Sequence, residues 1–117
     1  MMTAMSDANN LIARIWSATA TCAGAESYGR YFTGTLLPEL RKLPGFVGAY
    51  LLGNDPDAPD DTTVKLTACT FWDSLDAIRA FAGDDISVSI VEPEARAMLL
   101  SFDRTATHRG VLADARG

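Results

Sequence analysis

The stretch that decides the fold is FWDSLDAIRAFAG, residues 71–83, in which an apolar strand end passes directly into an amphipathic helix. Asp73 is placed to cap this helix, with Asp76 three positions later, and Gly83 is placed to end it. The apolar side of the predicted helix consists of Leu75, Ile78, Phe81 and Ala82. The segment therefore predicts a strand followed at once by a helix.

Four apolar segments predict strands on either side of this point. Residues 11–22 (LIARIWSATATC) are apolar on both parities, which is typical of a strand covered on both faces. Residues 46–53 (FVGAYLLG) and 62–72 (TTVKLTACTFW) flank an acidic loop and predict an antiparallel pair. Residues 102–112 (FDRTATHRGVL) predict the fourth strand.

The segment between the first two strands predicts a long helix. Its apolar residues recur at spacings of three and four over residues 24–43. Pro38 lacks the amide that would bond Gly34, so we expect a kink or break near residues 34–38, and Pro44–Gly45 ends the element. After the helix at residues 73–83, capping signals predict two short helices, over 84–91 and 92–100.

The resulting order β-α-β-β-α-β predicts an α+β, ferredoxin-like domain with a four-stranded antiparallel sheet and its helices on one face. We expect an N-terminal tail at residues 1–9, a single domain at 10–112 and a C-terminal fringe at 113–117. Because the strands are apolar on both faces, the second face needs a cover, and a second copy of the chain is the simplest one. The sequence thus predicts a homodimer formed by sheet-on-sheet packing.

Composition narrows the function classes. A chain of 117 residues has no room for a separate dinucleotide-binding domain. A net charge of −5 with scattered Lys and Arg argues against nucleic acid, and the absence of a long apolar run argues against a membrane span. The first residues do not resemble a signal peptide, so we expect a cytoplasmic protein with Cys22 and Cys69 as buried thiols.

The sequence offers little for a metal. The acidic loop carries Asp55, Asp57 and Asp61, but the sixth and twelfth positions of an EF-hand counted from Asp55 hold Asp60 and Leu66 instead of Gly and Glu. One histidine and two separated cysteines do not make a tetrahedral site. We expect no metal.

The candidate catalytic residues lie on strands. His108 is the one side chain whose ordinary pKa suits proton exchange near neutrality. Arg14 lies among apolar neighbours and needs a partner if buried, which is a ligand anion, an acidic side chain or a carbonyl at a dimer interface. The aromatic candidates for walls of a flat-ligand pocket, which serve equally as core, are Trp16, Tyr28, Tyr31, Phe32, Trp72 and Phe81.

The chain resembles the antibiotic biosynthesis monooxygenase-like family of the dimeric α+β barrel superfamily over nearly all of residues 10–112. The resemblance rests on IARIW (12–16), PELRKLPGFVGAYLL (38–52), FWDSLDAIRAFAGDD (71–85), VEPEARAMLLSF (91–102) and THRGV (107–111). It implies a homodimer with a pocket between helices and sheet in each subunit. It also implies an activity: oxidation of aromatic metabolites without a cofactor, the substrate itself activating dioxygen.

The resemblance leaves the activity open. The haem-degrading branch of the family has an Asn, a Trp and a haem-ligating His at positions that hold Trp16, Phe81 and Val91 here, which disfavours haem degradation. No complete catalytic set of the polyketide-oxidising branch matches. The alternatives are a dimeric module that binds a small apolar ligand or serves in stress without turnover, and, more remotely, an isomerase or lactone-processing enzyme.

Overall fold

A computed structural model describes residues 11–54 and 62–115 of the chain. The strands are β1 (Ile12–Thr21), β2 (Phe46–Leu52), β3 (Thr63–Trp72), β4 (Ser101–Phe102) and β5 (Thr107–Gly110). The helices are α2 (Cys22–Tyr31), the π-helix η1 (Phe32–Leu36), α3 (Leu37–Leu40), α4 (Leu75–Ala82) and α5 (Pro93–Arg96). This order confirms the predicted ferredoxin-like α+β fold. The predicted tail at residues 1–9 and the acidic loop at 55–61 lie outside the described residues.

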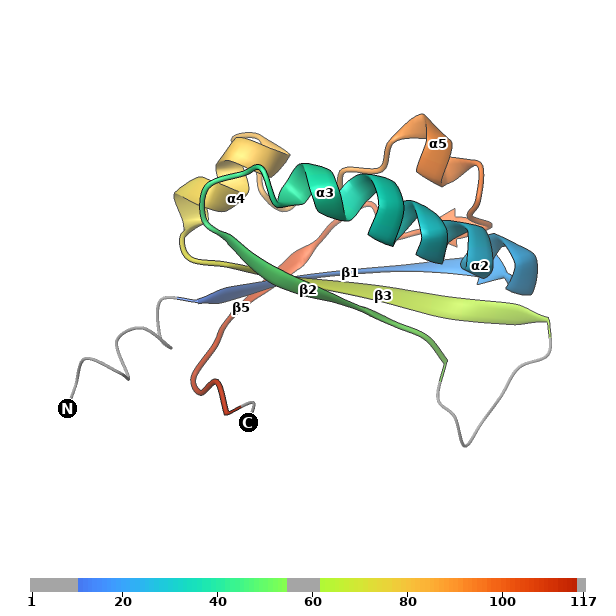
Figure 1. Cartoon of the computed structure of the whole chain (residues 1–117), viewed down its shortest axis with the longest axis horizontal. Coiled ribbons are helices and arrows are strands. Elements are labelled where there is room, and N and C mark those ends of the chain that lie inside the picture. Colours follow the sequence, from blue (N-terminus) through green and yellow to red (C-terminus); the bar gives the residue numbers. More distant parts are fainter. Residues whose placement is uncertain (1–10, 55–61, 116–117) are drawn as a thin grey trace.

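The sheet is antiparallel and has the order β2-β3-β1, with β4 and β5 both pairing with the outer edge of β1. Its centre is the long pairing of β1 with β3, which runs from Ile12 opposite Trp72 to Thr21 opposite Thr63. All helices lie on one face of this sheet (Figure 1). Side chains alternate along a strand, so one parity of β1 faces the helices. It is the even-numbered one, from Ile12 to Ala20, because Trp16 and Ala20 pack in the core cluster with Tyr28 of α2.

The first long helix is interrupted close to Pro38, where the sequence predicts a kink or break. Residues Phe32–Leu36 form a π-helical turn in which the amide of Leu37 donates to the carbonyl of Phe32. The wider turn lets the chain continue into α3 without the amide that Pro38 lacks, as a π-bulge commonly does. The expected break near residues 34–38 is confirmed in this form.

The turn before β2 depends on Gly45. Its φ is +89°, and a Cβ at this position would lie 2.5 Å from the Cβ of Ala77 and 2.5 Å from a carboxylate oxygen of Asp73. Asp73 also donates its backbone N–H to the carbonyl of Gly45 over 2.9 Å. Asp73 thus fixes this turn, and the prediction that it caps α4 is wrong: Ser74 is the cap, accepting from the amide of Ala77 at 3.1 Å.

The predicted helices at residues 84–91 and 92–100 are largely wrong. Only Pro93–Arg96 is helical, and Val88 instead forms an antiparallel bridge with Thr105. Two backbone bonds flank this bridge, from Ser89 to the carbonyl of Arg104 at 3.0 Å and from Ala106 to that of Ser87 at 2.8 Å. The sequence ISVSI alternates apolar and polar residues, which is the strand period, and here this period outweighed the capping signals.

The same bridge explains why the predicted strand at 102–112 is divided. β4 and β5 each pair with β1, but between them the chain pairs with residues 87–89 instead.

The described part of the chain contains no helix long and apolar enough to cross a membrane.

The core lies between the sheet and the helices in two clusters. One gathers around Tyr28, Phe32 and Leu66, and the other around Trp72 and Ile78. Trp72, Leu40 and Ile78 have the largest completely buried side chains of the described chain.

The opposite face of the sheet has no helix on it (Figure 1). Val47 and Tyr50 are 48% exposed there, and the ring of Tyr50 lies edge-on to Phe71 at 6.1 Å. Cys69 projects from the same face and is half-buried, whereas Cys22 is exposed at the start of α2, so the prediction of two buried thiols is wrong.

Candidate functional site

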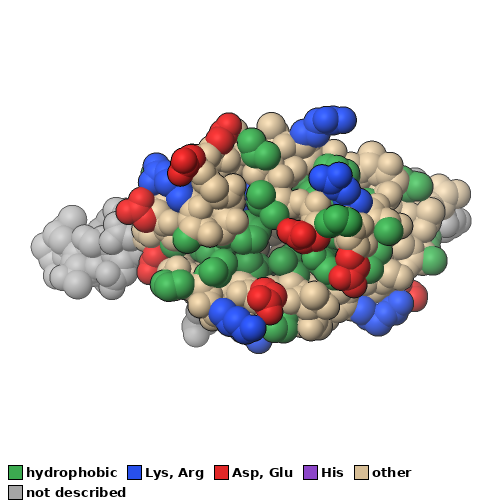
Figure 2. Space-filling model, turned by 90° about the horizontal axis from the view of Figure 1, so that it is seen from above, with side chains coloured by type: hydrophobic (Ala, Val, Ile, Leu, Met, Phe, Trp, Pro, Cys, Tyr) green, Lys and Arg blue, Asp and Glu red, His purple; other side chains and the backbone are tan. Residues whose placement is uncertain are grey.

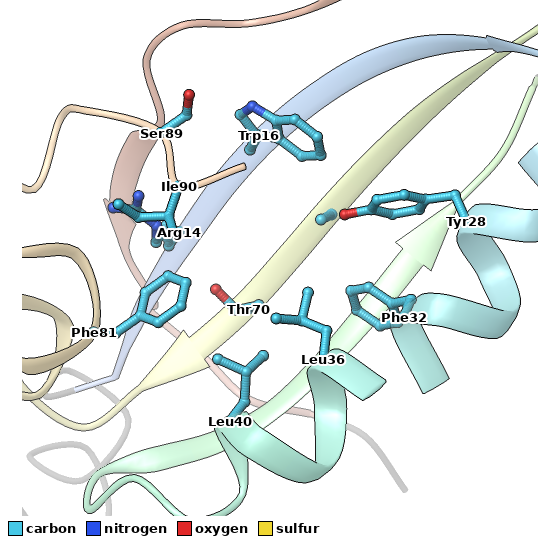
Figure 3. A pocket seen from close by; sticks show the side chains of 11 residues that line it. Arg14, Trp16, Tyr28, Phe32, Leu36, Leu40, Thr70, Phe81, Ser89 and Ile90 are labelled. Carbon is cyan, nitrogen blue, oxygen red and sulfur yellow. The ribbon is translucent and has the colours of Figure 1, made fainter. Parts of the chain in front are cut away.

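A pocket opens between the sheet and the helices, on the face where hydrophobic side chains line a central hollow (Figure 2). β1, β3, α2, η1, α3, α4 and the 86–91 segment all contribute to its surroundings (Figure 3). Its lining residues are Arg14, Trp16, Tyr28, Phe32, Leu36, Leu40, Ala68, Thr70, Phe81, Ser89 and Ile90. The predicted wall residues Trp16, Tyr28, Phe32 and Phe81 are thus brought together.

Aromatic rings form two ends of this pocket. At one end the ring of Tyr28 lies 6.2 Å from Trp16 and 6.3 Å from Phe32. At the other end Phe81 lies under the guanidinium of Arg14, with the central carbon 5.7 Å from the ring centroid. Rings at such distances can pack against the faces and edges of a flat, apolar ligand.

Trp72 does not line the pocket. It is completely buried, stacks on Phe81 at 5.6 Å and meets Phe46 edge-on at 5.3 Å. Its indole N–H donates to the hydroxyl of Thr70 at 2.9 Å. Trp72 therefore supports two wall residues, Phe81 and Thr70, from behind and is not itself part of the lining.

Arg14 is the buried cation of the site, only 6% exposed. Its Nη1 donates to the carbonyl of Ile86, its Nη2 donates to the carbonyl of Val88 at 3.0 Å, and Nη1 lies 3.0 Å from Nε2 of His108. No carboxylate of the described residues forms a salt bridge with it, and burial lowers its pKa. Among the described residues, the partners of Arg14 are thus two carbonyls and the imidazole of His108, and none of them is an acid.

His108 lies on β5, directly across from Arg14 on β1. An arginine only donates, so Nε2 of His108 accepts this hydrogen bond and the imidazole is neutral. Burial, and then the charge of Arg14, lower the pKa of His108. His108 is absent from the pocket lining, so it contacts Arg14 and not the space where a ligand would lie.

The lowered pKa of His108 predicts a specific loss of stability in acid. As pH falls below the ordinary value near 6.5, the unfolded chain binds the proton before the folded one, so stability present above pH 6.5 is lost on acidification. Urea unfolding at pH 7.5 and pH 5.5 measures this loss. His108→Gln keeps a neutral acceptor for Arg14 and should show a smaller loss; an equal loss in both proteins contradicts the assignment.

Neutral hydroxyls complete the polar part of the lining. Tyr28 is 3% exposed, and burial raises its pKa to about 12, so it remains protonated near neutrality. Thr70 accepts from Trp72, which leaves its own hydroxyl proton for a further acceptor. These groups can donate hydrogen bonds to a ligand, but neither is a base at neutral pH.

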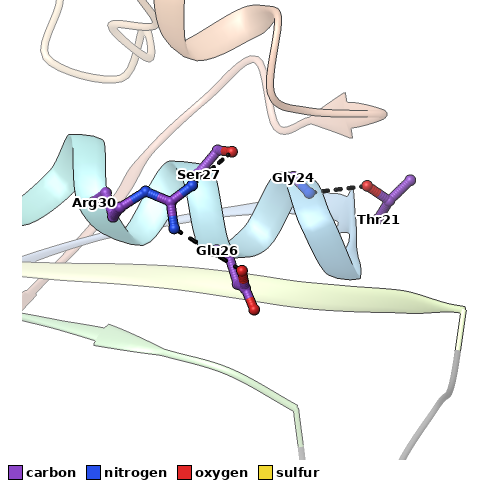
Figure 4. Close-up of polar contacts among 5 residues, drawn as sticks. All are labelled: Thr21, Gly24, Glu26, Ser27 and Arg30. Carbon is purple, nitrogen blue, oxygen red and sulfur yellow. Dashed lines mark hydrogen bonds and ion pairs between the residues drawn. The ribbon is translucent and has the colours of Figure 1, made fainter.

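The helix that carries Tyr28 is fixed at its start by Thr21, whose hydroxyl accepts from the amide of Gly24 at 2.9 Å (Figure 4). Along its exposed side, Arg30 lies 3.9 Å from Glu26, an exposed pair that contributes little. A Cβ on Gly24 would lie 2.4 Å from the carbonyl oxygen of Met98, so glycine lets α2 approach the segment after α5.

The pocket also contains residues that the sequence did not indicate. Leu36 and Leu40 belong to the apolar stripe of the first helix, and Thr70 shares the parity of Trp72 on β3, so their positions follow from periodicity. Ser89 and Ile90 come from the segment predicted as helix and were missed for that reason. Among residues 11–54 and 62–115, no three His, Cys, Asp or Glu side chains gather as a metal site.

No protein-family model and no curated protein matches the sequence. A candidate antibiotic biosynthesis monooxygenase from Bacillus cereus superposes with a TM-score of 0.60 at 14% identity, over 92% of this chain and 99% of that one. A heme-degrading protein from Mycobacterium tuberculosis gives 0.56 at 18% identity, over 93% and 100%. A Streptomyces coelicolor monooxygenase in complex with nanaomycin D gives 0.50 at 18%, over 92% and 89%.

These likenesses cover nearly the whole of each chain, and at such identities they concern the fold alone. They do not distinguish between the activities that the names of these proteins state. Together with the order of strands and helices, they identify the architecture that the sequence resemblance implied. This chain has the fold of the antibiotic biosynthesis monooxygenase-like proteins.

Proposed function

We propose that the protein is a cofactor-independent monooxygenase that oxidises a small phenolic or otherwise hydrophobic aromatic metabolite in the pocket between sheet and helices. The observation that carries this proposal is Arg14, a buried guanidinium on an aromatic-walled pocket with no carboxylate partner among the described residues. A buried charge is costly when it is not paired. A bound phenolate would supply the missing negative charge.

The chemistry follows from that charge. A cation beside the ligand oxygen favours the phenolate over the phenol, and a phenolate is rich enough in electrons to transfer one to dioxygen. Combination of the two radicals at a ring carbon, with uptake of a proton, gives a hydroperoxide. Loss of water from this hydroperoxide leaves a quinone carbonyl, so one oxygen atom enters the product and the other leaves as water.

The pocket lining has no group suited to removing the phenol proton. Tyr28 is protonated at neutral pH, and His108 lies outside the lining and accepts from Arg14. The substrate must therefore bind as the phenolate or lose its proton to water under the influence of Arg14. The rate should accordingly rise with pH through the pKa of the bound phenol rather than through that of a protein group.

The size of the pocket limits what enters without rearrangement. Its volume is about 50 Å³, whereas an apolar cavity of roughly 150 Å³ takes up benzene. Ile90 is the lining residue nearest to solvent among the large hydrophobic ones, at 40% exposed. Movement of this side chain would enlarge the pocket at the lowest packing cost.

Oxygen consumption in metal-chelated buffer tests the proposal. The probes are naphthols and anthrols, with product masses recorded by mass spectrometry. We expect dioxygen uptake and a product heavier by one oxygen and lighter by two hydrogens. Binding of the probes without dioxygen uptake would contradict the monooxygenase assignment.

A binding module without turnover is the second candidate, and it is favoured by the lack of a base in the lining. In that case small aromatics should raise the thermal unfolding temperature and quench tryptophan fluorescence while no product forms, because a ligand that binds only the folded state stabilises it.

We also propose that two chains associate through the open face of the sheet. Val47, Tyr50 and Leu52 are about half exposed on β2, at the edge of a face without helices. Sedimentation at micromolar concentration should give twice the chain mass, and Tyr50→Asp should shift it toward the monomer because it places a charge in an apolar contact. Thr33→Asp, on the helical side, is the matched control; a monomeric wild type would contradict the proposal.

A further inference from the structure

The hydroxyl of Tyr28 is an unpartnered polar group inside the pocket. Tyr28 is 97% buried, since 3% of its surface is exposed, yet no described residue forms a hydrogen bond with it. Its ring is held by Trp16, Tyr31 and Phe32 at 6.2, 5.7 and 6.3 Å. Figure 3 shows the hydroxyl pointing from α2 into the pocket.

The packing around Tyr28 fixes this direction. Rings contact it from both β1 and its own helix, so the phenol has little freedom to turn its oxygen toward solvent. No buried side-chain N or O atom of the described residues lacks a partner, so the Tyr28 oxygen, which has none, must reach the open space of the pocket, where water or a bound molecule can pair with it. The hydroxyl is therefore placed to meet a ligand or the water that the ligand replaces.

Tyr28 and Arg14 lie at opposite ends of the pocket, so a ligand that contacts both needs a polar group at each of its own ends. Arg14 and Phe81 lie at one end of the pocket, and Tyr28 with Phe32 lies at the other (Figure 3). The two polar groups also differ in kind, because Arg14 is a cation and Tyr28 is a neutral donor. A ligand that satisfies both has an anionic oxygen at one end and a neutral acceptor at the other.

We propose that Tyr28 is a specificity-determining residue that donates a hydrogen bond to a second, uncharged oxygen of the ligand. The pocket thus selects aromatics that carry a carbonyl or ether oxygen on the side opposite the phenolate. This inference rests on the proposed function only in assigning the phenolate end to Arg14. A ligand without the second oxygen displaces the water from Tyr28 and leaves the hydroxyl unpaired, which is the source of discrimination.

A matched pair of probes tests this inference without turnover. 6-Hydroxy-1-tetralone carries a carbonyl opposite its phenol, and 5,6,7,8-tetrahydro-2-naphthol is the same bicycle without it. Binding of each is measured by tryptophan fluorescence under anaerobic conditions. The Tyr28 hydrogen bond should favour the tetralone in wild type by about threefold to tenfold, the range of one neutral hydrogen bond, in addition to the preference that Arg14 has for its more acidic phenol.

Tyr28→Phe removes only the hydroxyl and should lower the preference for the tetralone by about threefold to tenfold, while leaving the affinity for tetrahydronaphthol unchanged. Tyr31→Phe is the matched control, since Tyr31 is the neighbouring buried tyrosine and does not line the pocket. It should keep the preference, and a thermal melt of both variants checks that the ring packing persists.

The outcomes separate this inference from the proposed function. Equal affinities in wild type, or a preference in Tyr28→Phe as large as that of wild type, overturn the role of Tyr28 while leaving the pocket proposal in place. If neither probe binds the wild-type protein, the pocket proposal itself fails, and the inference about Tyr28 fails with it.

Discussion

Arg14→Met should lower the rate of phenol oxidation by about 100- to 1000-fold, the usual effect of removing one group that stabilises a developing anion. Methionine keeps the length of the aliphatic stem but removes the one buried cation of the pocket. The bound phenol would then ionise at a higher pH. Steady-state oxygen uptake at saturating naphthol measures the effect on kcat.

A second readout separates this electrostatic role from a structural one. Arg14 also holds the carbonyls of Ile86 and Val88, so its removal weakens the segment that carries Ser89 and Ile90. The ultraviolet spectrum of bound naphthol reports its ionisation directly. Wild type should show the phenolate at a pH below the free pKa of the probe, and Arg14→Met should show the neutral form.

Arg41→Met is the matched control for Arg14→Met. Arg41 directly follows α3, on the helical side of the molecule, and its side chain is exposed. This variant should retain both the rate and the spectrum. An Arg14→Met protein that remains folded and oxidises the probe at the wild-type rate would remove the observation that carries the proposed function.

Trp72→Ala should lower the free energy of unfolding by about 3–5 kcal/mol, the range for deleting a buried tryptophan. Trp72 is completely buried, packs between Phe46 and Phe81 and satisfies the hydroxyl of Thr70. A domain of this size has a total stability of about 5–15 kcal/mol, so the variant should be partly unfolded at moderate temperature. Urea unfolding followed by circular dichroism measures the change.

Trp72→Phe is the graded control. It keeps an aromatic ring against Phe81 and loses the bond to Thr70, so we expect a loss of about 1–3 kcal/mol. A decrease of less than about 1 kcal/mol in the free energy of unfolding of Trp72→Ala would show that Trp72 contributes little to the stability of the core cluster around Trp72 and Ile78.

The fold was predictable because apolar residues recur with the period of a strand or of a helix, and because Gly, Pro and capping residues mark most ends of these elements. The alternation in β1 and β3 and the stripe on α2 place most pocket residues, since side chains of one parity on β1 and β3 face the same helices. Pro38 predicts an interruption there because it lacks the amide that would bond Gly34, and the interruption takes the form of the π-helical turn. Trp16, Tyr28, Phe32 and Phe81 were expected together for these local reasons.

The partners of Arg14 were not predictable from the sequence. It donates to the carbonyl of Ile86, 72 positions away, and every residue offers the same carbonyl. The residue type at position 86 therefore does not indicate this contact, whereas an acidic side chain would have indicated a possible partner for Arg14. The contact of His108 depends on the same geometry, because only its register opposite Arg14 shows that its ring lies beside the guanidinium.

The extended segment at residues 87–89 has a consequence for access to the pocket. Ser89 belongs to the lining, and its amide and that of Ala106 complete a short ladder at the sheet edge. Widening the pocket beyond what movement of the Ile90 side chain allows would displace Ser89 and break these backbone bonds, so entry of a larger ligand would be coupled to fraying of this edge. The affinity for a ligand that needs this opening is then reduced by the small population of opened molecules, and the exchange of these two amide protons with water reports how often the edge opens.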